Sequence, residues 1–393
     1  MRTARRYLAL EIYRSCGVVL LALLGLFTFF SLVDDLDGVG KKFSLLAMLY
    51  MQALATPSRL YDLLPIGLLI GSVLALAGLA QRNELVILRV SGVSGLRLLG
   101  TLWIITVPLM LGALFLSEYL TPVAEIRSSE VSLALRGQAS GGRLASGYWF
   151  KEPLPGGGTR IINIKTLLGN GAVRDVMMYE LAPTLELSLV AQAGSGTLMS
   201  GGELALRDVT ETRIDPKASE ALADARPPAS PPATVVTQAE LRLPTTLSPG
   251  RLLARVLTPE RMSIASLLDY IDYLHHNGLQ ADRQIVAMWR KVVYPFTLLV
   301  MITIAAPISF MQTRRGGVGA KVFIGILLGV GFFMLNQLAL NVGMLGRWPP
   351  WVTALGPNII ALLIALGALS AMEYRTTLGN LMAGRWPWKK ALA

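Results

Sequence analysis

The chain has 393 residues, of which 53% are hydrophobic and only 16% are charged, and its mean hydropathy is +0.53. A charged fraction well below the usual quarter excludes an ordinary soluble domain and indicates a membrane protein. The formal charge of +11 is explained by Lys and Arg on cytoplasmic loops and by anionic lipid, so we expect no nucleic-acid partner. The single cysteine, Cys16, excludes an intrachain disulfide and a thiolate metal site.

Six uncharged runs are long enough to cross a bilayer core of about 30 Å as helices. They cover residues 17–33, 63–80, 98–117, 292–311, 322–346 and 348–372. The first run is too long for a signal-peptide core, so we expect a retained first span. Prolines inside the spans are tolerated where neighbouring helices supply new donors to the freed carbonyls; they are Pro65, Pro108, Pro295 and Pro307.

Several glycines in the second and fifth spans either allow close helix contacts or mark weak packing without a specific partner. They are Gly67, Gly71, Gly78, Gly325, Gly329 and Gly331. The pattern leaves both interpretations open.

Lys and Arg near the ends of the spans predict the orientation. They concentrate before the first span, between spans two and three, between spans four and five, and after span six. We therefore expect both termini in the cytoplasm and the large insert between spans three and four in the periplasm.

The insert contains short stretches rich in β-branched and aromatic residues, separated by glycine turns. These stretches cover 148–150, 160–164, 173–181, 186–191, 203–209 and 234–243. They predict an all-β sandwich or barrel of jelly-roll type over 122–260. The chain then divides into 1–121 with three transmembrane helices, the β domain, and 261–393 with the remaining three.

A helix is expected after the strands, because apolar residues from Ile264 to Leu274 recur at three- and four-residue steps. Ser263 is its expected N-cap and Gly278 its stop. The helix could lie along the outer membrane face or pack against the sheet. Asp269, Asp272 and His276 share one of its faces, as a metal site could require, but we interpret them as its solvated face and expect no metal.

Residues 80–92, A-Q-R-N-E-L-V-I-L-R-V-S-G, lie between the second and third spans. Wound as one helix, Arg82 and Arg89 share a face, and apolar residues cover most of the remaining circumference around them and Glu84. The segment is either a short helix at the cytoplasmic membrane surface that contacts a partner protein, or an ordinary charged loop.

No pattern for catalysis is present. Residues 38–42 fail as a phosphate-binding loop, because Asp35 holds the first glycine position and Phe43 stands where Ser or Thr belongs. There is no G-x-S-x-G or H-E-x-x-H motif, and the only two histidines are adjacent. We expect no catalytic residues and no cofactor, and any ATPase that drives the protein must be another chain.

Three basic residues at the outer side are candidates for contacts with lipid phosphates, since a charge-assisted pair to phosphate is strong. They are Lys41, Lys42 and Arg136. The alternative for the lysines is local pairing with the aspartates at 34, 35 and 37, and for Arg136 it is solvent.

The stretches 80–92 and 288–295, the latter M-W-R-K-V-V-Y-P, resemble the LptF/LptG permease family of lipopolysaccharide export, and within it the LptG type. A-Q-R-x-E-L is the most specific piece, W-x-K-x-x-x-P supports it, and L-V-D-D-L at 32–36 is also similar. The order of three spans, insert and three spans matches over nearly the full length. The basic pair of LptG-type members comes earlier than Lys41-Lys42 here, whereas Arg136 matches a family arginine.

The resemblance implies a permease subunit of an ABC transporter that pairs with an LptF-type permease. Their first and fifth spans would line a cavity that takes lipopolysaccharide from the inner membrane. An LptB-type ATPase dimer would dock on the helix after span two, which places Arg82, Glu84 and Arg89 in the coupling segment. The insert would be a β-jelly roll in a periplasmic bridge with LptC and LptA.

Two other functions remain as alternatives. One is a non-transport assembly protein that transmits cytoplasmic ATP hydrolysis to periplasmic partners. The other is a membrane enzyme acting on lipid head groups, which the missing catalytic groups disfavour.

Overall fold

A computed structural model describes residues 2–36, 38, 40, 44–84, 87, 90, 94–136, 147–154, 157–167, 171–199, 202–215, 218, 231–245, 258–310 and 318–373. The chain forms two compact units. The helical unit comprises Met1–Asp34, Thr56–Thr121 and Asp282–Ala393, and the insert unit comprises Asp35–Ala55 and Pro122–Ala281.

Six long helices are apolar enough to cross a membrane, which confirms the six expected spans. They are α1 (Arg2–Leu36), α2 (Leu45–Gln81), α4 (Gly95–Phe115), α9 (Asp282–Phe310), α10 (Val318–Leu345) and α11 (Pro350–Glu373). Most exceed the uncharged runs, because helical hydrogen bonding continues past the first charged residues. Helix α4 continues through a π-helical turn, η1 (Leu116–Leu120), into α5 (Thr121–Arg136).

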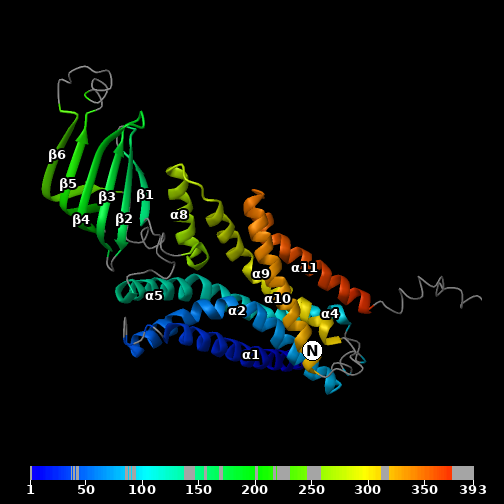
Figure 1. Ribbon diagram of the computed structural model, residues 1–393. Helices are drawn as coiled ribbons and strands as arrows, with labels where there is room; N and C mark the ends of the chain where they lie inside the picture. Colours follow the sequence, from blue (N-terminus) through cyan, green and yellow to red (C-terminus); the bar gives the residue numbers. More distant parts are fainter. Residues whose placement is uncertain are drawn as a thin grey trace, which may run out of the picture. The chain divides into compact units, whose positions relative to one another are not determined.

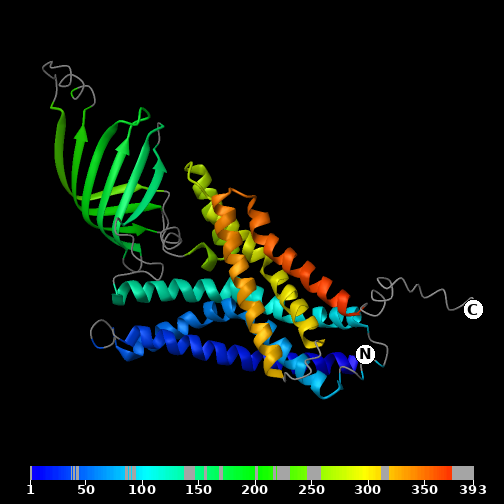
Figure 2. The same cartoon turned by 45° about the vertical axis from the view of Figure 1, so that its right-hand side comes forward.

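The centre of the helical unit is formed by α2 and α9, whose most apolar stretches are each 67% buried. The corresponding share is 6% for α1 and 17% for α10, so these two helices lie at the periphery of this chain. Both views show α1 (blue) running beside α2 (Figures 1 and 2).

Glycines mark the closest helix contacts. Gly71 of α2 lies against the backbone of Cys16 on α1, and Gly325 of α10 lies against Val73 of α2. The interpretation of close packing is confirmed at Gly71 and Gly67, whereas an added Cβ at Gly325 or Gly329 would make only ordinary van der Waals contact with α2, and at Gly78 it would meet only the side chain of Arg82. It does not apply to Gly331, which has nothing near the position of an added Cβ.

The described strands of the insert form one antiparallel sheet in which each strand pairs with its sequence neighbours. All six expected strands are confirmed, and each is longer than predicted: β1 (Tyr148–Pro153), β2 (Thr159–Leu167), β3 (Ala172–Leu181), β4 (Leu187–Met199), β5 (Glu203–Ile214) and β6 (Ala233–Pro244). Alternating residues of one face form an apolar core that includes Phe150, Ile162 and Val209. The described strands follow the order of a meander, so the expected jelly-roll topology is not confirmed.

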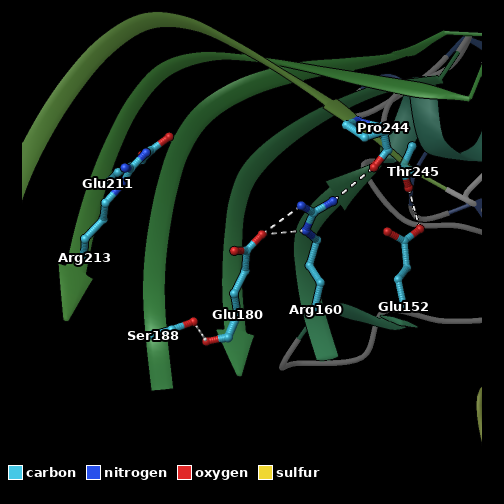
Figure 3. A network of polar contacts seen from close by, with 8 residues as sticks. All are labelled: Glu152, Arg160, Glu180, Ser188, Glu211, Arg213, Pro244 and Thr245. Carbon is cyan, nitrogen blue, oxygen red and sulfur yellow. Dashed lines mark hydrogen bonds and ion pairs between the residues drawn. The ribbon is translucent and has the colours of Figure 1, made fainter. Parts of the chain in front are cut away.

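The sheet is so strongly coiled that its last strand crosses over its first two (Figure 3). Arg160 of β2 pairs with Glu180 at 2.8 Å and also donates to the carbonyl of Pro244 at 3.0 Å. Thr245 donates to the carboxylate of Glu152 on β1. By register, Pro244 and Arg160 stand at opposite ends of the sheet, so these bonds close it diagonally.

Helix α8 (Ile264–His276) has the predicted start and stop. The hydroxyl of Ser263 accepts from the backbone N–H of Ser266 at 3.1 Å, and Gly278 has a φ of +62°. Tyr273 donates to the carbonyl of Lys151 on β1 at 3.0 Å, so α8 packs against the sheet. The side chains of Asp272 and His276 are 73% and 74% exposed, as a solvated face requires.

Candidate functional site

The chain turns sharply where α2 ends. The N–H of Asn83 donates to the carbonyl of Ala80, and Asn83 has a φ of +59°. Asparagine is one of the few non-glycine residues that readily adopts this left-handed conformation. The N–H of Ile87 then donates to the carbonyl of Asn83 at 3.1 Å, which begins a new helical turn. The helix expected over 80–92 is therefore interrupted at Asn83, and Arg82 directly follows α2, with its N–H donating to the carbonyl of Gly78.

Arg82 ties this turn to α1. Its Nη2 donates to Oε1 of Glu11 at 2.6 Å, and its Nε lies 3.7 Å from Oε1 of Glu84. Tyr7, one turn before Glu11, presents its hydroxyl to Glu84. The hydrogen bond that Arg82 donates to the carboxylate of Glu11 raises the pKa of Arg82. We call Tyr7, Glu11, Arg82 and Glu84 the elbow cluster.

The two described residues that follow Glu84 most closely in the sequence are strongly exposed. Ile87 and Val90 are 63% and 84% exposed, and they lie three positions apart. One helical turn with such spacing places both side chains on similar sides. Glu84 keeps 33% of its side chain exposed despite its contact with Arg82. The elbow thus presents a partly exposed carboxylate and two exposed apolar side chains, while the guanidinium of Arg82 is bonded within the chain.

The other predicted site residues are not brought together by described contacts. Lys41, Lys42 and Arg89 lie outside the described residues, and Arg136 is the last residue of α5, where its side chain is not described. Their proposed roles remain predictions.

Sequence reasoning missed Arg59 of α2. Its Nη2 donates to Oγ of Ser31 at 2.7 Å and its Nη1 to Oγ1 of Thr28 at 3.5 Å, both on α1. The available signal was its position shortly before the uncharged run 63–80. No sequence pattern tells that its partners are two hydroxyls on a different helix.

The two least buried helices expose large apolar side chains within this chain. These side chains are Leu21, Phe27, Phe29 and Phe30 on α1, and Phe323, Leu327, Phe333 and Met334 on α10. Surfaces of this kind suit contact with lipid tails or with an apolar partner helix.

Comparisons with known proteins agree with the membrane architecture. The family model described as "Lipopolysaccharide export system permease LptF/LptG" matches residues 6–371. The chain is 26% identical over 371 residues to the lipopolysaccharide export system permease protein LptG of Escherichia coli K12, covering 93% of this chain and 97% of that protein. It is 24% identical over 378 residues to the LptG protein of Haemophilus influenzae, covering 94% and 99%.

Proposed function

The chain belongs to the LptF/LptG family of lipopolysaccharide export permeases, and we propose that it is the LptG-type permease subunit of an ABC transporter. It would extract lipopolysaccharide from the inner membrane of a Gram-negative bacterium and pass it towards the outer membrane. The match over nearly the whole chain to the family, together with the six apolar helices, carries this proposal.

The lipid-binding surface would be formed by α1 and α10, the first and fifth spans. Support comes from their exposure, since their most apolar stretches are only 6% and 17% buried in this chain. Paired with an LptF-type permease, the exposed aromatic and aliphatic side chains of both helices would line a lateral cavity for acyl chains. Lys41, Lys42 and Arg136 would contact the lipid phosphates at its outer end.

An LptB-type ATPase dimer would dock from the cytoplasm on the segment that follows Asn83. Glu84, Ile87 and Val90 supply a partly exposed carboxylate and two exposed apolar side chains. Arg82 would act differently from the sequence prediction, because its bond to Glu11 links the docking segment to α1. Movement of the ATPase would thereby reach the first span directly.

Transport further requires that lipid bind more weakly in the closed state than in the open one, because ligand and conformation are linked. The β domain would lie in the periplasm and form a bridge with LptC and LptA, along which the released lipid moves. Both termini would be cytoplasmic.

The test is purification of the chain from native membranes with its partners, followed by ATP-dependent release of lipopolysaccharide from proteoliposomes. Glu84→Ala should lower both co-purification of the ATPase and lipid release, and Glu84→Gln should test whether the charge is needed. Glu240→Gln on β6, with a 45% exposed side chain, is the matched control. A complex that hydrolyses ATP and binds periplasmic partners but contains and releases no lipid would overturn export and favour the assembly protein.

A further inference from the structure

Helix α9 presents two hydrogen-bond donors on one face, Lys291 and Tyr294. They lie three residues apart, which places them on neighbouring sides of a helix. Lys291 is only 5% exposed, although a buried ammonium group is costly unless it is well bonded. Both residues belong to the stretch 288–295, and the proposed lipid and ATPase contacts involve neither.

Lys291 donates a hydrogen bond to a backbone carbonyl that has lost its helical donor. In an α-helix, the carbonyl of Ser117 would accept from the N–H of Thr121. In η1 the N–H of Thr121 donates instead to the carbonyl of Leu116, five residues back. The next residue, Pro122, has no N–H to offer. Nζ of Lys291 donates to the carbonyl of Ser117 at 3.1 Å and so fills this gap in the ladder.

Tyr294 reaches a second released carbonyl, on α2. The helical donor for the carbonyl of Tyr61 would be residue 65, which is a proline and has no N–H. The hydroxyl of Tyr294 donates to that carbonyl, and the two tyrosine rings stack with centroids 4.0 Å apart. A side chain of α9 therefore replaces the donor that Pro65 removes.

We propose that Lys291 and Tyr294 are positioning residues for lipid export, which clamp α9 to the ladder gaps in α2 and in α4–η1. Gaps in a helical ladder are where membrane helices bend. Bending of α2 at Pro65, or of the α4–η1 segment at η1, therefore either breaks these hydrogen bonds or moves α9 together with the bending helix. The clamp lies where the chain leaves the helical unit after η1 and re-enters it through α9.

This inference rests on the proposed function, since the clamp would keep ATP-driven bending of α2 in step with α4 and α9. A released carbonyl without a donor inside a membrane protein is strongly unfavourable. Removing one donor should therefore leave the rate of ATP hydrolysis unchanged, while bending of α2 or of the α4–η1 segment is no longer transmitted to α9. The expected defect is a loss of coupling: less lipid released for each ATP consumed.

The first test uses the purified transporter in proteoliposomes and compares lipid released per ATP. Tyr294→Phe keeps the stacked ring and removes only the hydroxyl, and we expect release per ATP to fall about tenfold, equivalent to about 1.4 kcal/mol. Lys291→Met should give a similar loss, and Lys291→Arg should restore most of it because it keeps a cationic donor. Tyr50→Phe is the matched control, because Tyr50 lies outside both ladder gaps and is 51% exposed.

The decisive test restores the missing backbone donor. Pro65→Ala returns an N–H that can bond the carbonyl of Tyr61, so the hydroxyl of Tyr294 becomes redundant. In the Pro65→Ala background, Tyr294→Phe should lower thermal stability and release per ATP by less than half of its effect in the unmodified chain. Equal losses in both backgrounds would overturn the clamp, and so would release per ATP that stays unchanged in Tyr294→Phe and Lys291→Met.

The outcome separates the clamp from the proposed function. Thermal stability of the purified complex measures the interaction between positions 65 and 294 without any transport. An unmodified complex that releases no lipid would contradict export, while the stability comparison would still confirm or refute the bond between Tyr294 and the carbonyl released by Pro65.

Discussion

Gly71 of α2 lies against the backbone of α1, and Gly71→Ala should separate the two helices. A methyl group at this position would lie 2.5 Å from Cα and 2.7 Å from the backbone nitrogen of Cys16. Carbon atoms in contact normally lie about 3.5–4.0 Å apart. The shortfall of about 1 Å falls on the backbone of α1, which cannot rotate away as a side chain can.

The magnitude follows from two opposing effects. Overpacking of this kind costs about 1–3 kcal/mol, whereas Gly→Ala inside a helix gains up to about 1 kcal/mol of helix propensity. Gly331→Ala isolates the second effect, because nothing lies within 4 Å of its added Cβ. The two variants should therefore differ in free energy of unfolding by about 1–3 kcal/mol. Gly67→Ala should fall between them, because its neighbour is the flexible side chain of Leu20.

The assay is the thermal midpoint of the purified chain together with the labelling rate of Cys16, the only cysteine. Cys16 is 3% exposed in the packed state. In Gly71→Ala, the midpoint should fall by about 2 °C or more relative to Gly331→Ala, and a maleimide should label Cys16 faster. Equal midpoints and equal labelling in the two variants would refute the backbone contact between α1 and α2.

Three further predictions concern single side chains. Asn83→Gly should preserve docking of the ATPase, whereas Asn83→Val should weaken it, because a β-branched residue resists a φ of +59°; pull-down of the ATPase measures both, and equal capture would contradict this. Arg160→Met should destabilise the β domain by about 3 kcal/mol, since Glu180 loses its cation and Pro244 its donor. Hydrogen exchange should then accelerate at the end of β6, and unchanged protection there would exclude diagonal closure. Ser263→Ala should cost about 1 kcal/mol through the lost N-cap of α8, measured by denaturant unfolding against Ser266→Ala, which keeps the backbone N–H.

Periodic patterns predicted the elements well, because burial on one face leaves a regular trace in the sequence. Helix α8 follows from such a pattern, with its cap at Ser263 and its stop at Gly278, whereas the six strands follow from β-branched and aromatic stretches between glycine turns. The spans were located by their lack of charge, but their ends were not. Helix α1 runs from Arg2 to Leu36, since long basic side chains and solvated ends allow helical bonding outside the apolar run.

Contacts between elements could not be predicted from one sequence. Arg82 fits a partner-binding face when 80–92 is drawn as one helix, yet that helix is interrupted at the left-handed Asn83, and the guanidinium of Arg82 bonds Glu11 of α1. Arg82 and Glu11 are 71 positions apart in the sequence, so no local pattern indicates this pairing. Coiling of the sheet, which brings Pro244 to Arg160, likewise depends on twist accumulated over several strands.

One part of the clamp at α9 can be predicted from the sequence, and the other part requires the structure. A proline inside a span removes the N–H that would bond the carbonyl four residues earlier, so Pro65 indicates from the sequence alone that the carbonyl of Tyr61 needs another donor. The gap at Ser117 has a weaker signal, because Pro122 alone does not say that the ladder will shift to five-residue bonds in η1. Neither proline reveals its replacement donor. Lipid offers none, and here the donors come from another helix, since a buried lysine and a tyrosine three residues later on α9 supply both. Lys291 and Tyr294 of the stretch 288–295 therefore have a physical role that is independent of lipid or ATPase contact. Each donates a hydrogen bond to a backbone carbonyl of another helix that has lost its helical donor.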